Sequence, residues 1–159
     1  PLSVNQPNTR RSIMASYKAQ AFLAPKYMTG DGDGYTYIDT ATVPALAVGD
    51  TVEYAIPAGA EVHTLQFDST DLDSNGTPLL TFKCGYRSNA IDPKLATNDS
   101  YFGTGLTIGR SAGRVGPLSH KPIVFDEDVV VFLTVTAAAG TAAAGTITGI
   151  VSANCLGAK

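Results

Sequence analysis

The segment TDLDSNGTPLLTFKCG carries the side chains that most resemble a metal-binding pattern. Asp71, Asp73 and Asn75 stand at alternate positions and Gly76 follows, as in the first half of an EF-hand calcium loop. Such a loop needs a bidentate acid at its twelfth position, which is Phe82 here. Asn-Gly is also a strong signal for a two-residue hairpin turn. We therefore expect a hairpin turn without a metal or cofactor, with a weak cation site as the alternative.

Residues that could act in acid–base or nucleophilic catalysis are few. The chain has two histidines. His63 shares a period-two face with Leu65 and Phe67, which predicts a core or interface position rather than a general base. His120 falls in a loop, and no Cys, Ser or Asp stands at a spacing that suggests a triad with either histidine. The segment GTGLTIG lacks the GK[ST] ending of a phosphate loop. We therefore expect no enzyme.

The remaining charged residues and the thiols have ordinary explanations. The acidic run at residues 126–128 precedes an apolar stretch, where like charges usually face solvent and protect a sheet edge. Arg110 and Arg114 are expected to be solvated loop charges, with an anion or an acidic neighbouring subunit as the alternative. Cys84 alternates with apolar residues, so we expect a buried free thiol, and no structural disulfide with Cys155.

Composition is typical of a β-rich globular chain. The 159 residues are 44% hydrophobic and 16% charged, with 16 glycines and a net charge of -3. Residues 1–30 hold four bases and no acid, so the start of the chain is basic and the rest is acidic. Four bases are sparse for a nucleic-acid site, and the acidic remainder would repel phosphates. No stretch approaches the ~20 apolar residues of a membrane span.

The first part of the chain, residues 1–34, reads as an extended N-terminal arm with a glycine-rich hinge. Its apolar residues follow no sustained period and prolines interrupt it, although a short helix around residues 12–21 is compatible with the pattern. We expect the arm to order against a protein partner. The residues expected to bind that partner are Arg10, Arg11, Tyr17, Lys18, Phe22, Leu23, Lys26 and Tyr27.

Residues 35–159 read as one β-sheet body. Period-two alternation places Val52, Tyr54 and Ile56 on one face of a strand, and residues 129–135 are apolar on both faces, which predicts a central strand. Short strands separated by turn signals predict an all-β sandwich or barrel. Residues 89–117 are the least regular and are expected to form a long loop, with a short helix near residues 93–96.

Three stretches resemble small structural proteins of tailed bacteriophages. DLDSNGTPLLTFKCG resembles a "DLDxNGTPxLTLxxG" hairpin of that family. VGDTVEYAIPAGAEVHTLQF resembles its "xGDxxxLxxLPAGAxVxxxxF" pair of strands, and DEDVVVFLTVTAAAGTAAAGTITGIV resembles its closing hairpin. The stretches stand in the family's order and cover roughly residues 48–151.

This resemblance implies a capsid decoration, or cement, protein with a jelly-roll-like β-sandwich. Such a protein is made in the host cytoplasm and binds the outer surface of the major capsid protein lattice in the virion. It would associate with itself, as a homotrimer or alternatively a homodimer. Two other functions are kept as alternatives: another virion component in the tail, neck or head fibre, and a receptor- or carbohydrate-binding module. The last would use loop aromatics such as Tyr86, Tyr101 and Phe102.

Overall fold

The computed structural model describes residues 14–22 and 34–156, and within these ranges regular secondary structure consists of strands alone. This confirms the all-β fold class. A search of the described residues for a helix able to cross a membrane finds none. The strands are β1 (Ser16–Lys18), β2 (Gly34–Val43), β3 (Thr51–Ile56), β4 (Ala60–Ser69), β5 (Thr81–Ser88), β6 (Asn98–Leu106), β7 (Gly113–Val115), β8 (Ile123–Val124), β9 (Val129–Ala137) and β10 (Gly145–Cys155).

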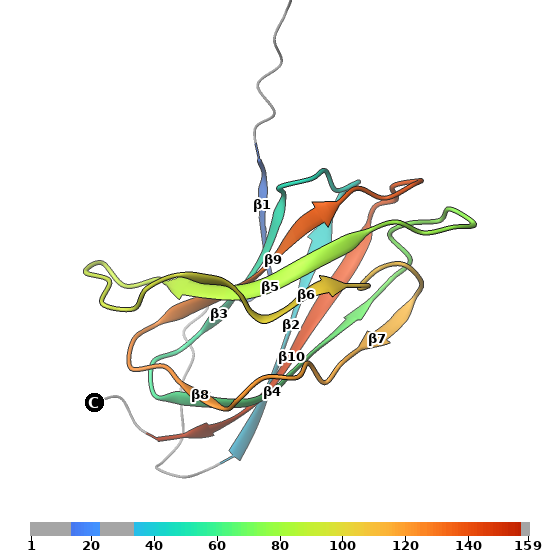
Figure 1. Cartoon of the computed structure of the whole chain (residues 1–159). Coiled ribbons are helices and arrows are strands. Elements are labelled where there is room, and N and C mark those ends of the chain that lie inside the picture. The colour runs from blue at the N-terminus through green and yellow to red at the C-terminus, as the bar shows by residue number, and fades with distance from the viewer. Residues whose placement is uncertain (1–13, 23–33, 157–159) are drawn as a thin grey trace, which may run out of the picture.

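The strands form a jelly-roll-like sandwich of two sheets (Figure 1). Sheet A has the order β1-β3-β9-β5-β6, and sheet B has the order β2-β10-β4-β7, with β8 also paired to β4. All pairings are antiparallel except that of β1 with β3, which is parallel. From β2 to β5, successive strands alternate between the sheets, so the chain crosses from one layer to the other at almost every turn.

The predicted core face of Val52, Tyr54 and Ile56 is confirmed. Side chains of both sheets meet between the layers, where apolar burial stabilises the fold by about 25 cal/mol per Å². Strand β9 is buried on both faces, as its apolar run predicts. The fully buried set includes Val52, Ile56, Leu65, Phe67, Leu80, Phe82, Cys84, Phe102, Phe125, Val129, Leu133 and Ile147.

The turn signals in the sequence mark crossovers and not hairpins. Residues 57–59 join β3 to β4, residues 70–80 join β4 to β5, and residues 138–144 join β9 to β10. In each case the flanking strands belong to opposite sheets. The predicted hairpin turn at Asn75-Gly76 is therefore wrong. A two-residue hairpin needs flanking strands that pair with each other, and here they lie in different layers.

The crossover at residues 70–80 is organised by one buried carboxylate. Asp73 is 1% exposed, and its Oδ2 accepts hydrogen bonds from the backbone N–H groups of Leu79 (2.7 Å), Leu80 (3.0 Å) and Gly140 (3.0 Å). Its Oδ1 accepts one from Thr141 N–H at 2.9 Å. The carboxylate therefore joins the crossover to the β9–β10 connection. Because backbone N–H groups bind both oxygens, the site favours the anionic form of the carboxyl group.

The carbonyl groups of the same crossover are held by an arginine. Arg110 Nε donates to Leu80 O at 2.7 Å, while Gly109 O accepts from Leu72 N–H (2.8 Å) and Asp73 N–H (3.1 Å). Arg110 is thus a structural residue, and the expectation of a solvated loop charge is wrong for it. We call this set the Asp73 clamp: the Asp73 carboxylate, the four amides that it binds, and the Arg110 guanidinium.

The pKa of Asp73 reflects two opposing effects. Burial raises the pKa of the carboxyl, but the four backbone N–H donors lower it further, and the balance lies well below the usual range. A depressed pKa means that the stabilisation is fully present above the unfolded-state pKa. It is lost as the pH falls through the folded-state pKa.

Two other sequence expectations are corrected by the strand pairing. His63 does not share the face of Leu65, because Ser152 of β10 pairs with Thr64 and Ala153 pairs with Val62. His63 is the extra residue of this β-bulge, which turns its side chain to solvent.

The expected loop at residues 89–117 contains β6 and β7, and residues 93–96 are not helical. Residues 16–18 likewise form β1 in place of the helix compatible with residues 12–21.

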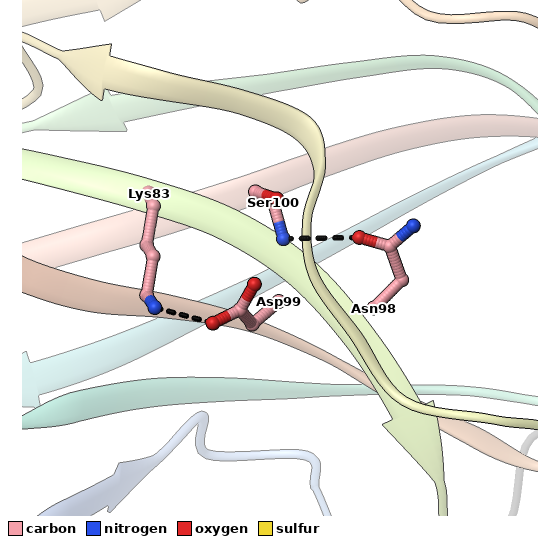
Figure 2. A network of polar contacts seen from close by, with 4 residues as sticks. All are labelled: Lys83, Asn98, Asp99 and Ser100. Atoms are coloured by element: carbon pink, nitrogen blue, oxygen red, sulfur yellow. Dashed lines mark hydrogen bonds and ion pairs between the residues drawn. The ribbon is translucent and has the colours of Figure 1, made fainter.

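A glycine lets β6 lie close over β5. Gly85 is buried, and a Cβ added there would overlap the Asn98 carbonyl oxygen and the Asp99 backbone. Figure 2 shows β6 at this crossing, where Asn98 Oδ1 accepts from Ser100 N–H and Lys83 forms an ion pair with Asp99. The hydrogen bond from Lys83 lowers the pKa of Asp99.

Replacing Asp73 with alanine should destabilise the fold strongly, because four backbone amides, including the buried one of Leu80, lose their shared acceptor. The measurement is the midpoint of urea unfolding, with Asp71→Ala as the control, since Asp71 accepts a single hydrogen bond from Asp73 N–H. We expect a much larger fall for Asp73→Ala. Equal midpoints for the two variants would contradict the clamp.

Replacing Gly85 with alanine should lower the free energy of unfolding by about 1–3 kcal/mol, because the added methyl group meets backbone atoms that cannot rotate away. Gly76→Ala is the control, since no atom lies within 4 Å of a Cβ at that position. Thermal unfolding of both variants checks this. A stability loss at Gly76 as large as that at Gly85 would show that close approach is not the reason.

The cysteines should be unreactive in the folded protein. Cys84 and Cys155 are free thiols and both are buried, and burial raises the pKa of Cys84. Because the thiolate is the nucleophile, alkylation by iodoacetamide should be slow in buffer and complete in denaturant. Rapid native labelling of Cys84, followed by mass spectrometry, would be inconsistent with this burial.

Candidate functional site

Part of the predicted arm forms the edge of sheet A. In β1, Tyr17 lies beside Val52 of β3, and Thr51 N–H donates to Ala15 O at 2.8 Å. Of the residues expected to bind a partner, Tyr17, Lys18 and Phe22 lie in the described part of the chain. The others lie outside the described residues: Arg10, Arg11, Leu23, Lys26 and Tyr27.

Two buried carboxylates hold the backbone of this segment at its two ends. Asp50 Oδ1 accepts from Ala15 N–H at 2.9 Å. Asp39 accepts from Ala21 N–H with both oxygens, at 3.0 and 3.2 Å, and from the Tyr37 hydroxyl at 2.8 Å. Burial and the neighbouring Asp39 raise the pKa of Tyr37 well above its usual value, so its hydroxyl stays a donor.

Phe22 covers the outer face of sheet A. Its side chain is 8% exposed and packs with Val130 and Phe132 of β9 and with Ala55 of β3. This contact explains how β9 is apolar on both faces: one face meets sheet B and the other lies under the arm. Lys18 Nζ lies 4.6 Å from the centre of the Phe22 ring, a cation–π geometry, and the Lys18 side chain is exposed.

An ion pair lies beside this apolar cluster. Arg87 Nη2 is 2.9 Å from Glu53 Oε1, and the guanidinium lies 5.9 Å from the centre of the Phe132 ring. Glu53 is 4% exposed, and its Oε2 has no hydrogen-bond partner among the described residues. Removing Arg87 would leave the buried Glu53 charge uncompensated, so Arg87 is needed to keep Glu53 in place.

Together these residues form one cluster of mixed character on the outer face of sheet A. We name it the arm patch: Lys18, Phe22, Glu53, Ala55, Arg87, Val130 and Phe132. It combines a covered apolar centre with two cationic groups, of which Lys18 is exposed and Arg87 is partly exposed.

The two histidines singled out in the sequence contact neighbouring side chains of the fold. His63 Nε2 lies 3.1 Å from Glu61 Oε2, and the His120 ring packs edge-on against Phe102 at 4.9 Å. Residues 14–22 and 34–156 contain no group of three or more His, Cys, Asp or Glu residues that could hold a metal ion.

The acidic run at residues 126–128 accepts hydrogen bonds from backbone N–H groups of neighbouring loops and does not only face solvent. Glu127 accepts from Lys94 N–H (3.2 Å) and Leu95 N–H (2.8 Å), and Asp128 accepts from Ala58 N–H (2.9 Å). Burial raises the pKa of Glu127, but these backbone bonds lower it, and the net shift is downward. The expectation that these acids merely face solvent is therefore incomplete.

Sequence reasoning missed the buried acids that hold the arm. Asp39 stands in the same period-two series as Tyr35, Tyr37 and Ala41, which point toward the core. A charged residue within an inward-facing series is the signal that could have identified it, because a buried carboxylate requires donors from outside its own strand. Asp50 gave a weaker signal, since Gly-Asp before a strand is common in turns.

Comparison with known proteins reveals similarity at the level of the fold. No protein-family model and no curated protein matches the sequence. A chain in the capsid of Ralstonia phage GP4 is similar with a TM-score of 0.72 at 23% identity, covering 89% of this chain and 98% of that chain. A chain in the capsid asymmetric unit of cyanophage Pam1 is similar with a TM-score of 0.60 at 21% identity, covering 86% and 94%.

Replacing Asp39 with alanine should release the arm segment while the sandwich stays folded. Hydrogen exchange of the Ala21 amide should accelerate about tenfold or more, because a hydrogen bond to a charged group is worth about 1.5–3 kcal/mol. Asp68→Ala is the control, since Asp68 is solvent-accessible and faces Arg114 at 3.6 Å. Unchanged exchange at Ala21 in Asp39→Ala would rule out this anchor.

Proposed function

We propose that this protein is a bacteriophage head decoration protein that binds the outer surface of the major capsid protein lattice and stabilises it. The observation that carries the proposal is the likeness to a chain of the GP4 capsid, which extends over nearly the whole of both chains. The two chains are thus of nearly the same size, and the match is to a complete small chain and not to one domain of a larger shell protein.

Two features of the described residues support this role. The sandwich is braced by the Asp73 clamp, and the outer surface of sheet A carries the arm patch. Residues 1–30 hold four bases and no acid, while the rest of the chain is acidic. A basic arm on an acidic body would orient the protein on an acidic shell surface with the body outward.

The partners in this proposal are the major capsid protein and further copies of this chain. Repeated on a symmetric lattice, modest contacts by each copy add up through multivalency. A homotrimer, or alternatively a homodimer, at a local symmetry axis would multiply the arms that engage the shell.

The alternative of a receptor- or carbohydrate-binding module has less support from the structure. It depended on loop aromatics, but Phe102 is fully buried and Tyr86 is nearly so. Tyr101 is partly buried and packs on both of them at ring-centre distances of 5.4 and 5.1 Å. These rings form part of the core rather than a stacking platform. A tail, neck or head-fibre position is the remaining alternative within a virion.

Reversing charge in the arm should abolish head binding. The double variant Arg10→Glu with Arg11→Glu should bind undecorated heads at least tenfold more weakly, and wild-type binding should weaken with salt. The assay is co-sedimentation of purified protein with heads. The matched control is Arg114→Glu with Lys121→Glu, which alters two exposed bases of the body.

The control should bind as the wild type does. Undiminished binding by the arm variant would mean that the body, and not the arm, binds the shell. A wild-type protein that fails to bind heads would refute the decoration function itself.

A further inference from the structure

The Asn75-Gly76 pair lies at the surface of the β4–β5 crossover. Both residues are exposed, and residues 75–77 belong to no strand. This is the one place in the sequence where an asparagine precedes a glycine. In such a pair the backbone nitrogen of the glycine can reach the side-chain amide carbon of the asparagine. That close approach is the first requirement for deamidation, the reaction that makes asparagine a thermolabile residue.

The glycine leaves the attacking nitrogen unobstructed. A Cβ added at Gly76 would meet no atom within 4 Å. Within residues 14–22 and 34–156, no acceptor takes a hydrogen bond from Gly76 N–H. A glycine backbone also rotates more widely than that of any other residue. The Gly76 nitrogen is therefore exposed, unpaired within the described chain and able to turn toward the Asn75 side chain.

The Asn75 amide is folded back over the peptide that would attack it. Its Oδ1 accepts a hydrogen bond from Thr77 N–H at 2.9 Å, and its Nδ2 donates to Thr141 Oγ1 at 3.4 Å. The first bond reaches two residues along the chain, so the Gly76 nitrogen lies within the ring that this bond closes. It also draws electron density from the amide carbon. Both bonds are exposed, so water can replace them as the amide turns.

Exposure alone does not distinguish Asn75 from other asparagines. Asn89 is also exposed, but the residue after it is Ala90, and Ala90 N–H donates to Ser88 Oγ at 3.1 Å. The nitrogen after Asn89 therefore carries a side chain beside it and is already hydrogen-bonded. Asn89 is thus an internal reference for Asn75 in the same molecule.

We propose that Asn75 is a site of spontaneous deamidation, with water as the co-reactant. The Gly76 nitrogen loses its proton to solvent and attacks Asn75 Cγ. A bond forms between this nitrogen and Cγ, the Cγ–Nδ2 bond breaks, and Nδ2 leaves as ammonia. Water then opens the resulting cyclic imide at either carbonyl group. One opening gives aspartate, and the other gives isoaspartate, in which the main chain runs through Cβ and Cγ. One water is consumed and one ammonia is released.

The modification would act on the Asp73 clamp, because Asn75 packs on the segment that the clamp binds. A Cβ added at Gly140 would lie 2.7 Å from Asn75 Nδ2, and the N–H groups of Gly140 and Thr141 are two of the four donors to Asp73. Either product places a second carboxylate near that of Asp73, and like charges disfavour each other. Isoaspartate also lengthens the main chain of the crossover. The modified crossover should therefore be held less firmly.

Incubation of purified protein at mildly alkaline pH tests the site, because base deprotonates the attacking nitrogen. In ¹⁸O-labelled water, peptide mapping by mass spectrometry should find one labelled oxygen gained at Asn75, about tenfold or more faster than at Asn89. Gly76→Ala is the matched variant, because its methyl group meets no other atom, and it should slow conversion of Asn75 about tenfold or more. An unconverted Asn75, or equal rates in wild type and Gly76→Ala, would overturn the proposed site.

Urea unfolding tests the effect on the clamp. Incubated wild-type protein should unfold at a lower urea midpoint than fresh protein, whereas incubated Gly76→Ala should keep its fresh midpoint. Fresh Asn75→Asp should show part of the same fall, because it carries the aspartate product without isoaspartate. An unchanged midpoint in protein whose Asn75 has been converted would overturn the link to the clamp. The reaction needs no partner, so its failure is distinguishable from a failure of head binding.

Discussion

The Asp73 carboxylate binds backbone N–H groups that the crossovers of this topology leave without a strand partner. Each crossover between sheets leaves backbone N–H groups without a strand partner, and a buried unpaired amide costs about 1–3 kcal/mol. One carboxylate accepts four of these groups, from Leu79, Leu80, Gly140 and Thr141. Arg110 holds the carbonyl group of Leu80 on the same crossover. The ends of β4, β5, β9 and β10 are thereby fixed relative to one another.

The outer faces of the two sheets differ in chemistry. Sheet A leaves Val130 and Phe132 on its outer face, which must be covered, and Phe22 covers them. This apolar contact adds to the β1–β3 pairing and the bonds to Asp39 and Asp50 that place residues 15–22 on the body. The outer face of sheet B presents threonines, which need no such cover in water.

The sequence predicts the strands and fails at the connections, for physical reasons. Alternation in β3 and β5 and the apolar run in β9 report burial directly, so their faces and the burial of Cys84 follow. The Asn75-Gly76 signal describes local backbone preference, which does not encode whether the flanking strands share a sheet. The solvent-facing position of His63 was not predicted, because one inserted residue reverses the face on which the side chains of a strand lie. The roles of Asp39, Asp50 and Asp73 depend on donors 18 to 68 residues away in the chain.

The central claim is that this chain occupies the outer surface of a phage head, with its arm toward the shell. A cryo-EM map of the purified virion tests it most directly, because the sandwich is large enough to be recognised and fitted as a rigid body. The account predicts sandwich-shaped density repeated across the outside of the shell, with β1 and the arm patch facing the major capsid protein. Density confined to the tail or neck, or a shell without the sandwich, would contradict it.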